Sequence, residues 1–169
     1  IVLDPDTGPL TGADIGRGRL PSPTQIADCV EAQFNANTGA LLGKHVVISA
    51  GGTQEEWDPV RFIGNRSSGK QGVALARAAL AAGAKVTLVA GHMDIDPPAG
   101  VETIHALSGE QMHKALVAVL DEQPDCVIMA AAVADFRPTT TSANKIKKAL
   151  GTQNLELEQT TDILADLCG

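Results

Sequence analysis

Three continuous apolar runs dominate the chain after residue 44, and they constrain the fold more than any other feature. The runs are HVVISA (45–50), KVTLVAG (85–91) and CVIMAAAVA (126–134). Such runs are typical of parallel strands that are buried on both faces. A shorter alternating run, VETIHA (101–106), predicts one more strand. Helical patterns separate the runs, so the sequence predicts an α/β fold with a Rossmann-like, doubly wound and mostly parallel sheet.

Two amphipathic helical patterns lie between these strands. We expect Ser67 or Ser68 to cap the first helix and Gly83 to end it. The second helix follows Ser108, and Gln111 three residues later predicts a capping box. In such folds ligands bind at the carboxyl ends of the strands, so the loops after the apolar runs are the first places to look for a site.

The beginning of the chain has a different composition. Residues 1–21 are rich in Gly, Pro and Asp and predict a loop-rich segment, and a Ser-Pro pair predicts a helix over about 24–34. Residues 35–39 have the composition of a linker, and we expect a domain boundary between 35 and 44. We therefore expect two parts, a lead segment at 1–43 and the α/β domain at 44–169.

Charge and cysteine content exclude several classes of protein. The chain has 169 residues and a net charge of −7, so it lacks the positive field that non-specific nucleic-acid binding needs. No apolar run approaches the roughly 20 residues of a membrane span. The three scattered cysteines form no disulfide or zinc pattern and fit a reducing, cytoplasmic setting, with Cys126 expected in the core.

The two ends of the chain predict a piece of a longer protein. The chain does not begin with Met, and it stops shortly after a helix signal at Asp162. We therefore expect an α/β domain whose sheet is truncated at the C-terminus.

A glycine turn and a polar loop follow the first apolar run. Glycines let the backbone approach a ligand, and the N–H groups and dipole of a helix start favour an anion. The loop over 53–63 reads as exposed and supplies cations near that helix start. The residues expected to bind a phosphate are Gly51, Gly52, Arg61, Ser67, Ser68, Gly69 and Lys70.

Two familiar nucleotide motifs do not fit this stretch. GNRSSGK (64–70) matches the GxxxxGK part of a P-loop, but Gln71 replaces the hydroxyl residue that would reach Mg²⁺, and the strand ends well before the motif. The glycines also do not form GxGxxG, which disfavours a dinucleotide site.

The last apolar run leads into a second group of candidate residues. The small side chains of MAAAVADF (129–136) either pack under a helix or leave room for a flat ligand, with Asp135 placed to hold a metal ion or a ribose hydroxyl. Lys145, Lys147 and Lys148 are either a solvated charge run or the cations that gather a triphosphate. Thr161 is either a helix cap or part of a phosphate-binding turn.

With GGTQEEWDPVRFIGNRSSGKQG (51–72) and AAAVADFRP…KIKK (130–148) both present, the chain resembles phosphopantothenoylcysteine synthetase. More specifically, it resembles the C-terminal half of the bacterial bifunctional decarboxylase/synthetase of coenzyme A biosynthesis. The resemblance covers about 44–169 and implies a ligase. In that reaction 4′-phosphopantothenate and CTP give an acyl-cytidylate, cysteine attacks it, and Mg²⁺ assists.

The resemblance also implies roles for individual residues. Asn65 matches the asparagine that holds the acyl-cytidylate, and Lys145 matches the lysine on the CTP phosphates, so these two are the expected catalytic residues. A metal ion, if bound by the protein, is expected at Asp135. The expected nucleotide-binding positions are Met129, Ala130, Ala131, Asp135, Lys145, Thr161, Asp162, Ile163 and Leu164. The resemblance further implies that the full-length protein is a homo-oligomer.

The chain departs from the family pattern at several positions. Gly64 and Arg66 flank the key asparagine in place of Ser and His, Gln71 replaces Met, and Thr160 and Thr161 replace Asn-Pro. These changes bear on loop rigidity and phosphate contacts.

The lead segment resembles the end of the fused decarboxylase. PDTGPLTGADIGRGRLP (5–21) keeps the frame of its flap, but Gly12 stands where the catalytic cysteine would fall. The flavin-binding body of that domain is not in the chain, so FMN and decarboxylation are not expected of it. Two alternatives to a ligase stay open: a nucleotide-binding module without catalysis, and a dinucleotide-dependent reductase.

Overall fold

The computed structural model describes residues 2–12, 14–35, 38–147 and 154–168. The elements in chain order are β1 (Asp6–Pro9), β2 (Ile15–Arg19), α1 (Pro23–Asn35), β3 (His45–Ala50), β4 (Gln54–Asp58), β5 (Arg61–Gly64), α2 (Lys70–Ala81), β6 (Lys85–Ala90), β7 (Glu102–His105), α3 (Gly109–Leu120), β8 (Cys126–Met129), β9 (Phe136–Pro138), β10 (Leu157–Gln159) and α4 (Ile163–Cys168).

A four-stranded sheet in the order β7-β6-β3-β8 forms the centre of the molecule, and each neighbouring pair is parallel. The predicted α/β fold is confirmed. From β3 the chain adds β6 and then β7 on one side of the sheet. It then crosses back and places β8 on the other side of β3, so the strand order reverses between β3 and β8. A crevice at such a reversal is where ligands bind in open α/β sheets.

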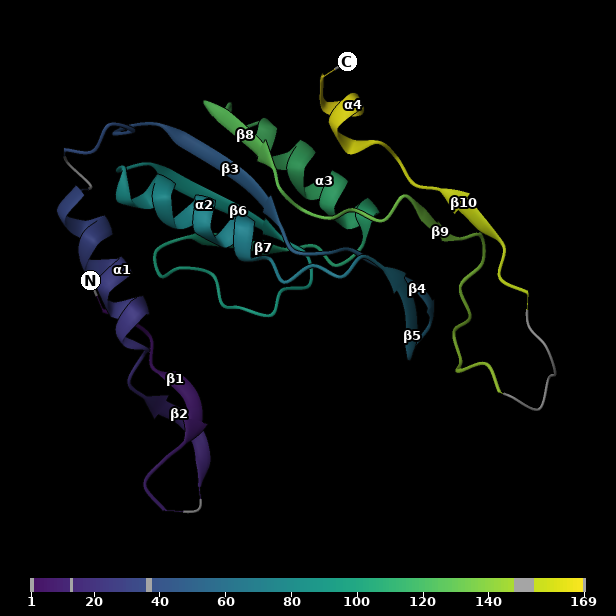
Figure 1. The fold of residues 1–169 in the computed structure, drawn as a ribbon, viewed down its shortest axis with the longest axis horizontal. Coiled ribbons are helices and arrows are strands. Elements are labelled where there is room, and N and C mark those ends of the chain that lie inside the picture. The colour runs from purple at the N-terminus through teal and green to yellow at the C-terminus, as the bar shows by residue number, and fades with distance from the viewer. Residues whose placement is uncertain (1, 13, 36–37, 148–153, 169) are drawn as a thin grey trace.

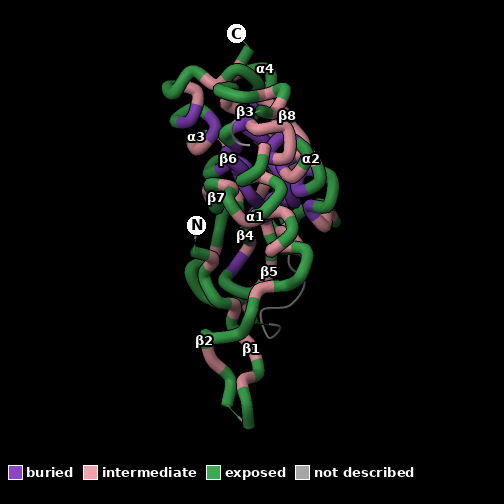
Figure 2. The backbone as a smooth tube through the Cα atoms, turned by 90° about the vertical axis from the view of Figure 1, so that its left-hand side faces the viewer, coloured by how far each residue is buried: buried purple, intermediate pink, exposed green. Residues whose placement is uncertain are grey.

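The two faces of the sheet bury different helices. Val46, Ile48 and Ala50 on β3 belong to a core cluster with α2, whereas Val47 belongs to a second cluster with α3 and with Ile163 of α4. The alternation follows from the two-residue period of a strand. Figure 2 shows the buried residues gathered in the sheet and its helices. Helices on both faces explain why the strands read as continuous apolar runs.

The segment predicted as an exposed loop over 53–63 is mostly a β-hairpin, and that prediction is wrong. β4 and β5 pair antiparallel, with Gln54 opposite Gly64. Glu55 and Asp58 are 5% and 1% exposed. Their polar side chains suggested a solvated loop, but hydrogen bonds from distant parts of the chain allow them to be buried. The hairpin extends beyond the carboxyl ends of the parallel strands (Figure 1).

The helix ends confirm some cap predictions and correct others. Ser108 and Gln111 form the predicted capping box, and Gly83 follows α2 with φ 87°. At the start of α2, however, the cap is Gly69 in the left-handed region and no side chain caps the helix, so the prediction of Ser67 or Ser68 is wrong. At α4 it is Asp162, not Thr161, whose carboxylate accepts from the third N–H, that of Ala165.

The last apolar run forms a shorter strand than predicted. β8 ends at Met129, and it pairs with β3 alone among the described strands. Cys126 is exposed, so its predicted place in the core is wrong. The reason is its position at the start of a strand on the edge of the described sheet.

The lead segment lies beside the α/β body. β1 and β2 form an antiparallel hairpin that projects away from the sheet in both views (Figures 1 and 2). α1 packs against α2, where Asp28 and Arg77 form an ion pair of 2.6 Å. Within the described ranges, no helix combines the length and apolar character needed to span a bilayer.

Candidate functional site

A glycine turn joins the ends of three parallel strands. Gly52 exchanges backbone hydrogen bonds of 2.9 and 2.8 Å with His92, which follows β6. Ala132, which follows β8, donates its N–H to the Gly51 carbonyl at 2.8 Å and accepts from Thr53 N–H at 3.1 Å. The turn therefore fixes the loops after β3, β6 and β8 against one another at the point where the strand order reverses.

Only glycine fits at the two turn positions. Gly51 has φ 80°, and a Cβ there would lie 2.4 Å from the carbonyl oxygen of His92. A Cβ on Gly52 would lie 2.8 Å from the carbonyl oxygen of Asn65. The lack of side chains brings the backbone of Asn65, the predicted catalytic residue, against the strand end.

The first cavity at this edge, the α2 cavity, lies at the start of α2 and has a volume of about 430 Å³. Its lining residues are Arg66, Ser67, Ser68, Gly69, Lys70, Gln71, Gly72, Ala130, Ala131 and Ala132. Arg66 and Lys70 are cationic, and in the part of the chain that the structure describes no carboxylate lines this cavity. The first N–H groups of a helix have no intrahelical acceptor, and without a side-chain cap those of α2 remain to bind an anion.

The second cavity, the α4 cavity, lies between the end of β8 and the start of α4 and has a volume of about 400 Å³. Its lining residues are Met129, Val133, Ala134, Asp135, Phe136, Gln159, Thr160, Thr161, Asp162, Ile163 and Leu164. Six of the predicted nucleotide positions therefore meet here although more than 20 residues separate the two segments. Asp135 and Asp162 give this cavity acidic groups, and the described residues that line it include no Lys or Arg.

The two cavities share one wall. The segment 129–135 lines both of them, with Ala130 to Ala132 facing the α2 cavity and Met129, Val133, Ala134 and Asp135 facing the α4 cavity. Asn65 Nδ2 donates to the Val133 carbonyl at 3.0 Å from the hairpin side. Thr160 Oγ1 donates to the Ala134 carbonyl at 2.6 Å from the α4 side. The predicted catalytic amide thus touches the wall between a cationic and an acidic cavity.

Of the predicted phosphate ligands, Ser67, Ser68, Gly69 and Lys70 line the α2 cavity, whereas Gly51, Gly52 and Arg61 are not among its lining residues. Arg61 is held by the hairpin. Its guanidinium pairs with the buried Asp58 carboxylate and lies over the Trp57 ring, 4.1 Å from the centroid. The ion pair, above all the hydrogen bond from Arg61, lowers the pKa of Asp58 far below its usual range. Arg61 therefore stabilises the hairpin, and a contact with phosphate stays a prediction.

The predicted catalytic Lys145 is carried by a loop that docks on the same hairpin. Ile146 N–H donates to Asp58 at 3.2 Å, and Ser142 N–H donates to the Trp57 carbonyl at 3.0 Å. Lys145 is exposed and is absent from the linings of both cavities as the described residues define them. Lys148 lies outside the described residues.

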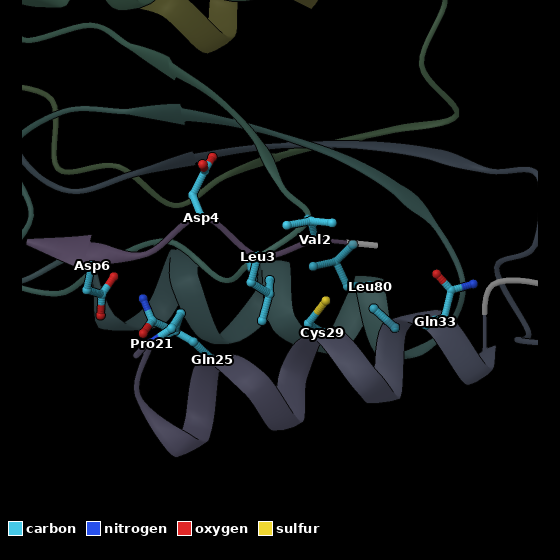
Figure 3. A pocket seen from close by; sticks show the side chains of 12 residues that line it. Val2, Leu3, Asp4, Asp6, Pro21, Gln25, Cys29, Gln33 and Leu80 are labelled. Atoms are coloured by element: carbon cyan, nitrogen blue, oxygen red, sulfur yellow. The ribbon is translucent and has the colours of Figure 1, made fainter. Parts of the chain in front are cut away.

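A third cavity lies elsewhere and does not collect the predicted residues. It has a volume of about 500 Å³ and lies between the lead segment, α1 and α2, where Leu3, Cys29 and Leu80 line it (Figure 3). Asp4 and Asp6 are its charged groups. Because it offers carboxylates and apolar side chains rather than cations, it does not fit a phosphate compound.

Two residues of the site were missed by sequence reasoning. Ser49 and Thr53 are both fully buried, and both hydrogen-bond to the shared wall. A hydroxyl inside the apolar run HVVISA was the available signal for Ser49, because a buried hydroxyl needs a partner.

Comparison with known proteins identifies the family. A family model described as DNA/pantothenate metabolism flavoprotein C-terminal domain matches residues 41–169. The chain belongs to this family. It is 49% identical over 170 residues to the coenzyme A biosynthesis bifunctional protein CoaBC of Mycobacterium tuberculosis, covering 98% of this chain and 40% of that protein. The corresponding protein of Bacillus subtilis is 46% identical over 167 residues, covering 98% of this chain and 41% of that protein.

A solved structure shares both fold and sequence with this family member. The crystal structure of the C-terminal domain of coenzyme A biosynthesis bifunctional protein CoaBC matches with a TM-score of 0.64 and 41% identity, over 79% of this chain and 60% of that one. The recognition from the two signature stretches is therefore confirmed. The chain spans about two fifths of the length of the curated relatives it matches.

Proposed function

We propose that this family member is the phosphopantothenate–cysteine ligase part of a coenzyme A biosynthesis protein. It would join 4′-phosphopantothenate and cysteine at the expense of CTP. The observation that carries the proposal is the pair of cavities of opposite charge on one wall, with Asn65 bound to that wall. The relatives named above support it, since their names place them in coenzyme A biosynthesis.

Charge assigns the substrates to the two cavities. The phosphate of 4′-phosphopantothenate fits the α2 cavity, because Arg66, Lys70 and the N–H groups of the α2 start oppose its charge. The base and ribose of CTP fit the α4 cavity, where Asp135 can accept from a ribose hydroxyl and apolar side chains can cover a flat ring. The α-phosphate and the carboxylate would then meet at the shared wall.

The proposed reaction has two steps. A carboxylate oxygen of 4′-phosphopantothenate bonds to the α-phosphorus of CTP while the bond to pyrophosphate breaks, which gives an acyl-cytidylate. The cysteine amine then bonds to the acyl carbon, CMP leaves with the electrons of the broken C–O bond, and the amine loses a proton to water. The product is 4′-phosphopantothenoylcysteine.

Asn65 and Lys145 have separate roles in these steps. An amide offers two N–H donors and a carbonyl oxygen, so the bond from Asn65 to Val133 leaves groups that can hold the mixed anhydride without attacking it. Lys145 would neutralise charge on the triphosphate when its loop reaches the bound nucleotide. Its exposed position on a docked loop is compatible with such an approach.

Mg²⁺ fits this site through the nucleotide. The part of the chain that the structure describes contains no cluster of three or more metal-ligating side chains. A Mg²⁺ ion is usually held by one or two carboxylates together with substrate phosphates, and Asp135 is the residue placed to supply one. The ion would spread the charge of the triphosphate.

We further propose a cytoplasmic enzyme that works as a homo-oligomer.

The roles of Asn65 and Lys145 are tested in the full-length protein. With CTP, Mg²⁺ and 4′-phosphopantothenate, Lys145→Gln should slow pyrophosphate release by about 100-fold, as expected for loss of a charge that stabilises a transition state. Asn65→Asp should release pyrophosphate but form little product after cysteine is added. Lys114→Gln is the control, because Lys114 pairs with Glu110 on the surface of α3.

Three outcomes would count against the proposal. Wild-type ligation rates in both variants would remove Asn65 and Lys145 from the mechanism. Binding of CTP without pyrophosphate release in the wild type would favour the nucleotide-binding module, which the changes at Gly64, Arg66 and Gln71 motivate. Binding of NADPH but not CTP, measured by calorimetry, would favour the reductase.

A further inference from the structure

Ser49 lies at the last paired position between β3 and β8. Its register partner is Met129, and beyond that pair the strand ladder is interrupted until the isolated parallel bridge between Gly52 and Ala132. The Ser49 hydroxyl, fully buried, accepts the N–H groups of both Ala130 and Ala131 at 3.1 Å. It also donates to Met129 Sδ at 3.8 Å. The Ser49 side chain thus supplies the hydrogen-bond acceptors that the strand ladder no longer supplies to Ala130 and Ala131, the two residues after Met129.

Thr53 does the same from the far side of the glycine turn. It is fully buried, and its Oγ1 accepts the N–H of Ala134 at 2.9 Å. Its backbone N–H donates to the Ala132 carbonyl at 3.1 Å. Ser49 and Thr53 therefore hold the wall at both ends, one beside the α2 cavity and the other beside the α4 cavity.

The hydroxyls are suited to this task because a buried backbone N–H without an acceptor is costly. Ala130, Ala131 and Ala134 have only methyl side chains, so packing alone does little to define their conformation. Each N–H has an acceptor at one defined place, which selects one path for the backbone. A change at either hydroxyl should alter the shape of the wall and leave the charges of both cavities in place.

We propose that Ser49 and Thr53 are positioning residues that fix the nucleotide-facing wall at 129–135, an inference that rests on the ligase function proposed above. Neither side chain is among the residues that line the cavities. They act through the backbone of the wall, and through it on the place where the α-phosphate of CTP meets the acyl carboxylate.

The test compares Thr53→Val with Thr87→Val in the full-length protein. Both threonines are buried, and both replacements remove one hydroxyl without changing the shape of the side chain. Thr87 bonds to His45 and Glu102 instead, away from the wall, so Thr87→Val reports the general effect of losing a buried hydroxyl. Thr53→Ser keeps the hydroxyl and is the rescue variant. Ser49→Ala tests the other end of the wall.

Two measurements are made on each variant: amide exchange at Ala130, Ala131 and Ala134 by NMR, and the kinetics of pyrophosphate release. In Thr53→Val, exchange at Ala134 should become about tenfold faster than in Thr87→Val, as for an N–H that loses a net hydrogen bond. The KM for CTP should rise by about tenfold at a similar thermal midpoint, and Thr53→Ser should stay near the wild type. In Ser49→Ala the faster amides should be Ala130 and Ala131.

The positioning role would be overturned if Thr53→Val and Thr87→Val gave the same exchange and the same KM. It would also be overturned if Thr53→Ser were as impaired as Thr53→Val, because loss of a methyl group would then explain the effect. A wild-type protein that released no pyrophosphate would contradict the ligase function, while the exchange rates would still show whether the hydroxyls hold the wall.

Discussion

Asp58 illustrates how one buried carboxylate organises a region of the molecule. It is 1% exposed, and it accepts from the backbone N–H groups of Val60, Arg61 and Ile146 as well as from the Arg61 guanidinium. The first two bonds close the turn between β4 and β5. The third attaches the loop that carries Lys145. A single side chain thus connects the hairpin with a predicted catalytic residue 87 positions along the chain.

Replacing Asp58 by Asn should destabilise the protein at neutral pH but much less in acid. Because Arg61 and the backbone donors lower the pKa of Asp58, its contribution to stability is fully present above the pKa of Asp in an unfolded chain, about 3.9. It is lost as the pH falls below that value towards the pKa of the folded state. The gap in urea midpoint between wild type and Asp58→Asn should therefore be constant from about pH 5 to 8 and shrink below about pH 4.

The control is Asp96→Asn, since Asp96 is exposed in the loop after β6. That replacement should shift the midpoint little at any of these pH values. An Asp58→Asn gap that grew as the pH fell from 5 to 3 would contradict the account.

At the scale of elements, the contact between α2 and β3 sets the position of the cationic cavity. A Cβ on Gly72 would lie 2.4 Å from the Cβ of Ala50, so helix and strand touch backbone to backbone in the first turn. Gly69 is equally restricted, since it has φ 74° and a Cβ there would lie 2.6 Å from Met93 Cγ. The helix start that faces the α2 cavity is therefore held close to the sheet by missing side chains.

Gly72→Ala should push α2 away from β3 and weaken phosphate binding. Overpacking of a tight contact costs about 1–3 kcal/mol, and here that cost outweighs the gain of up to about 1 kcal/mol that Ala brings to a helix interior. Gln71→Ala, one residue earlier and exposed, should change stability by less than about 0.5 kcal/mol. Urea unfolding and calorimetry with 4′-phosphopantothenate measure both effects. A Gly72→Ala variant as stable as Gln71→Ala would show that the contact is not tight.

The strands and helices that were predicted correctly from the sequence are those that are buried by packing against apolar side chains. The runs 45–50 and 85–91 and the helix after Ser108 show their burial in composition and spacing alone. The β4–β5 hairpin was missed because Glu55 is buried against the start of α3, where Gly109 N–H donates to it at 2.8 Å. A partner 54 positions away leaves no local pattern.

The site likewise has features that the sequence predicted and features that depend on contacts between distant residues. Small residues and a helix signal at the ends of apolar runs predicted the α2 cavity, and the family resemblance predicted most of the residues that meet in the α4 cavity. The roles of Ser49 and Thr53 were not predicted, because only folding brings their hydroxyls to the wall. The position of Lys145 was also beyond sequence reasoning, since Asp58 holds its loop from another element.

At the scale of the whole molecule, the α/β body contains nearly all of the buried core. The two core clusters consist of residues from β3 onwards, and α1 adds only the partly buried Ala32 among the described helices and strands of the lead segment. Ile15 and Leu20 of the hairpin region are 78% and 77% exposed. The boundary proposed near residue 43 stays a prediction, and this distribution of burial makes it testable.

Removal of residues 1–43 should leave a protein that still unfolds in one cooperative transition. The loss comprises the partly exposed Asp28–Arg77 pair and the packing of Ala32 and Leu41, about 1–3 kcal/mol in total. Removal of 1–21 alone should change the free energy of unfolding by less than about 0.5 kcal/mol, because it leaves α1 in place. Urea titration followed by circular dichroism compares the three chains. Loss of the cooperative transition in the shorter chain would mean that the lead segment is part of the domain.

Under the ligase function proposed above, the single wall between the two cavities has a consequence for redesign. A substitution within 129–135 that is chosen to admit a purine where we propose that cytosine binds would also reshape the proposed place of the acyl substrate, because each residue of the wall lines one cavity and is next in the chain to residues that line the other. Thr161 and Leu164 line the opposite side of the α4 cavity alone. A library that aims to exchange the nucleotide should vary those two positions first, and keep the wall as it is.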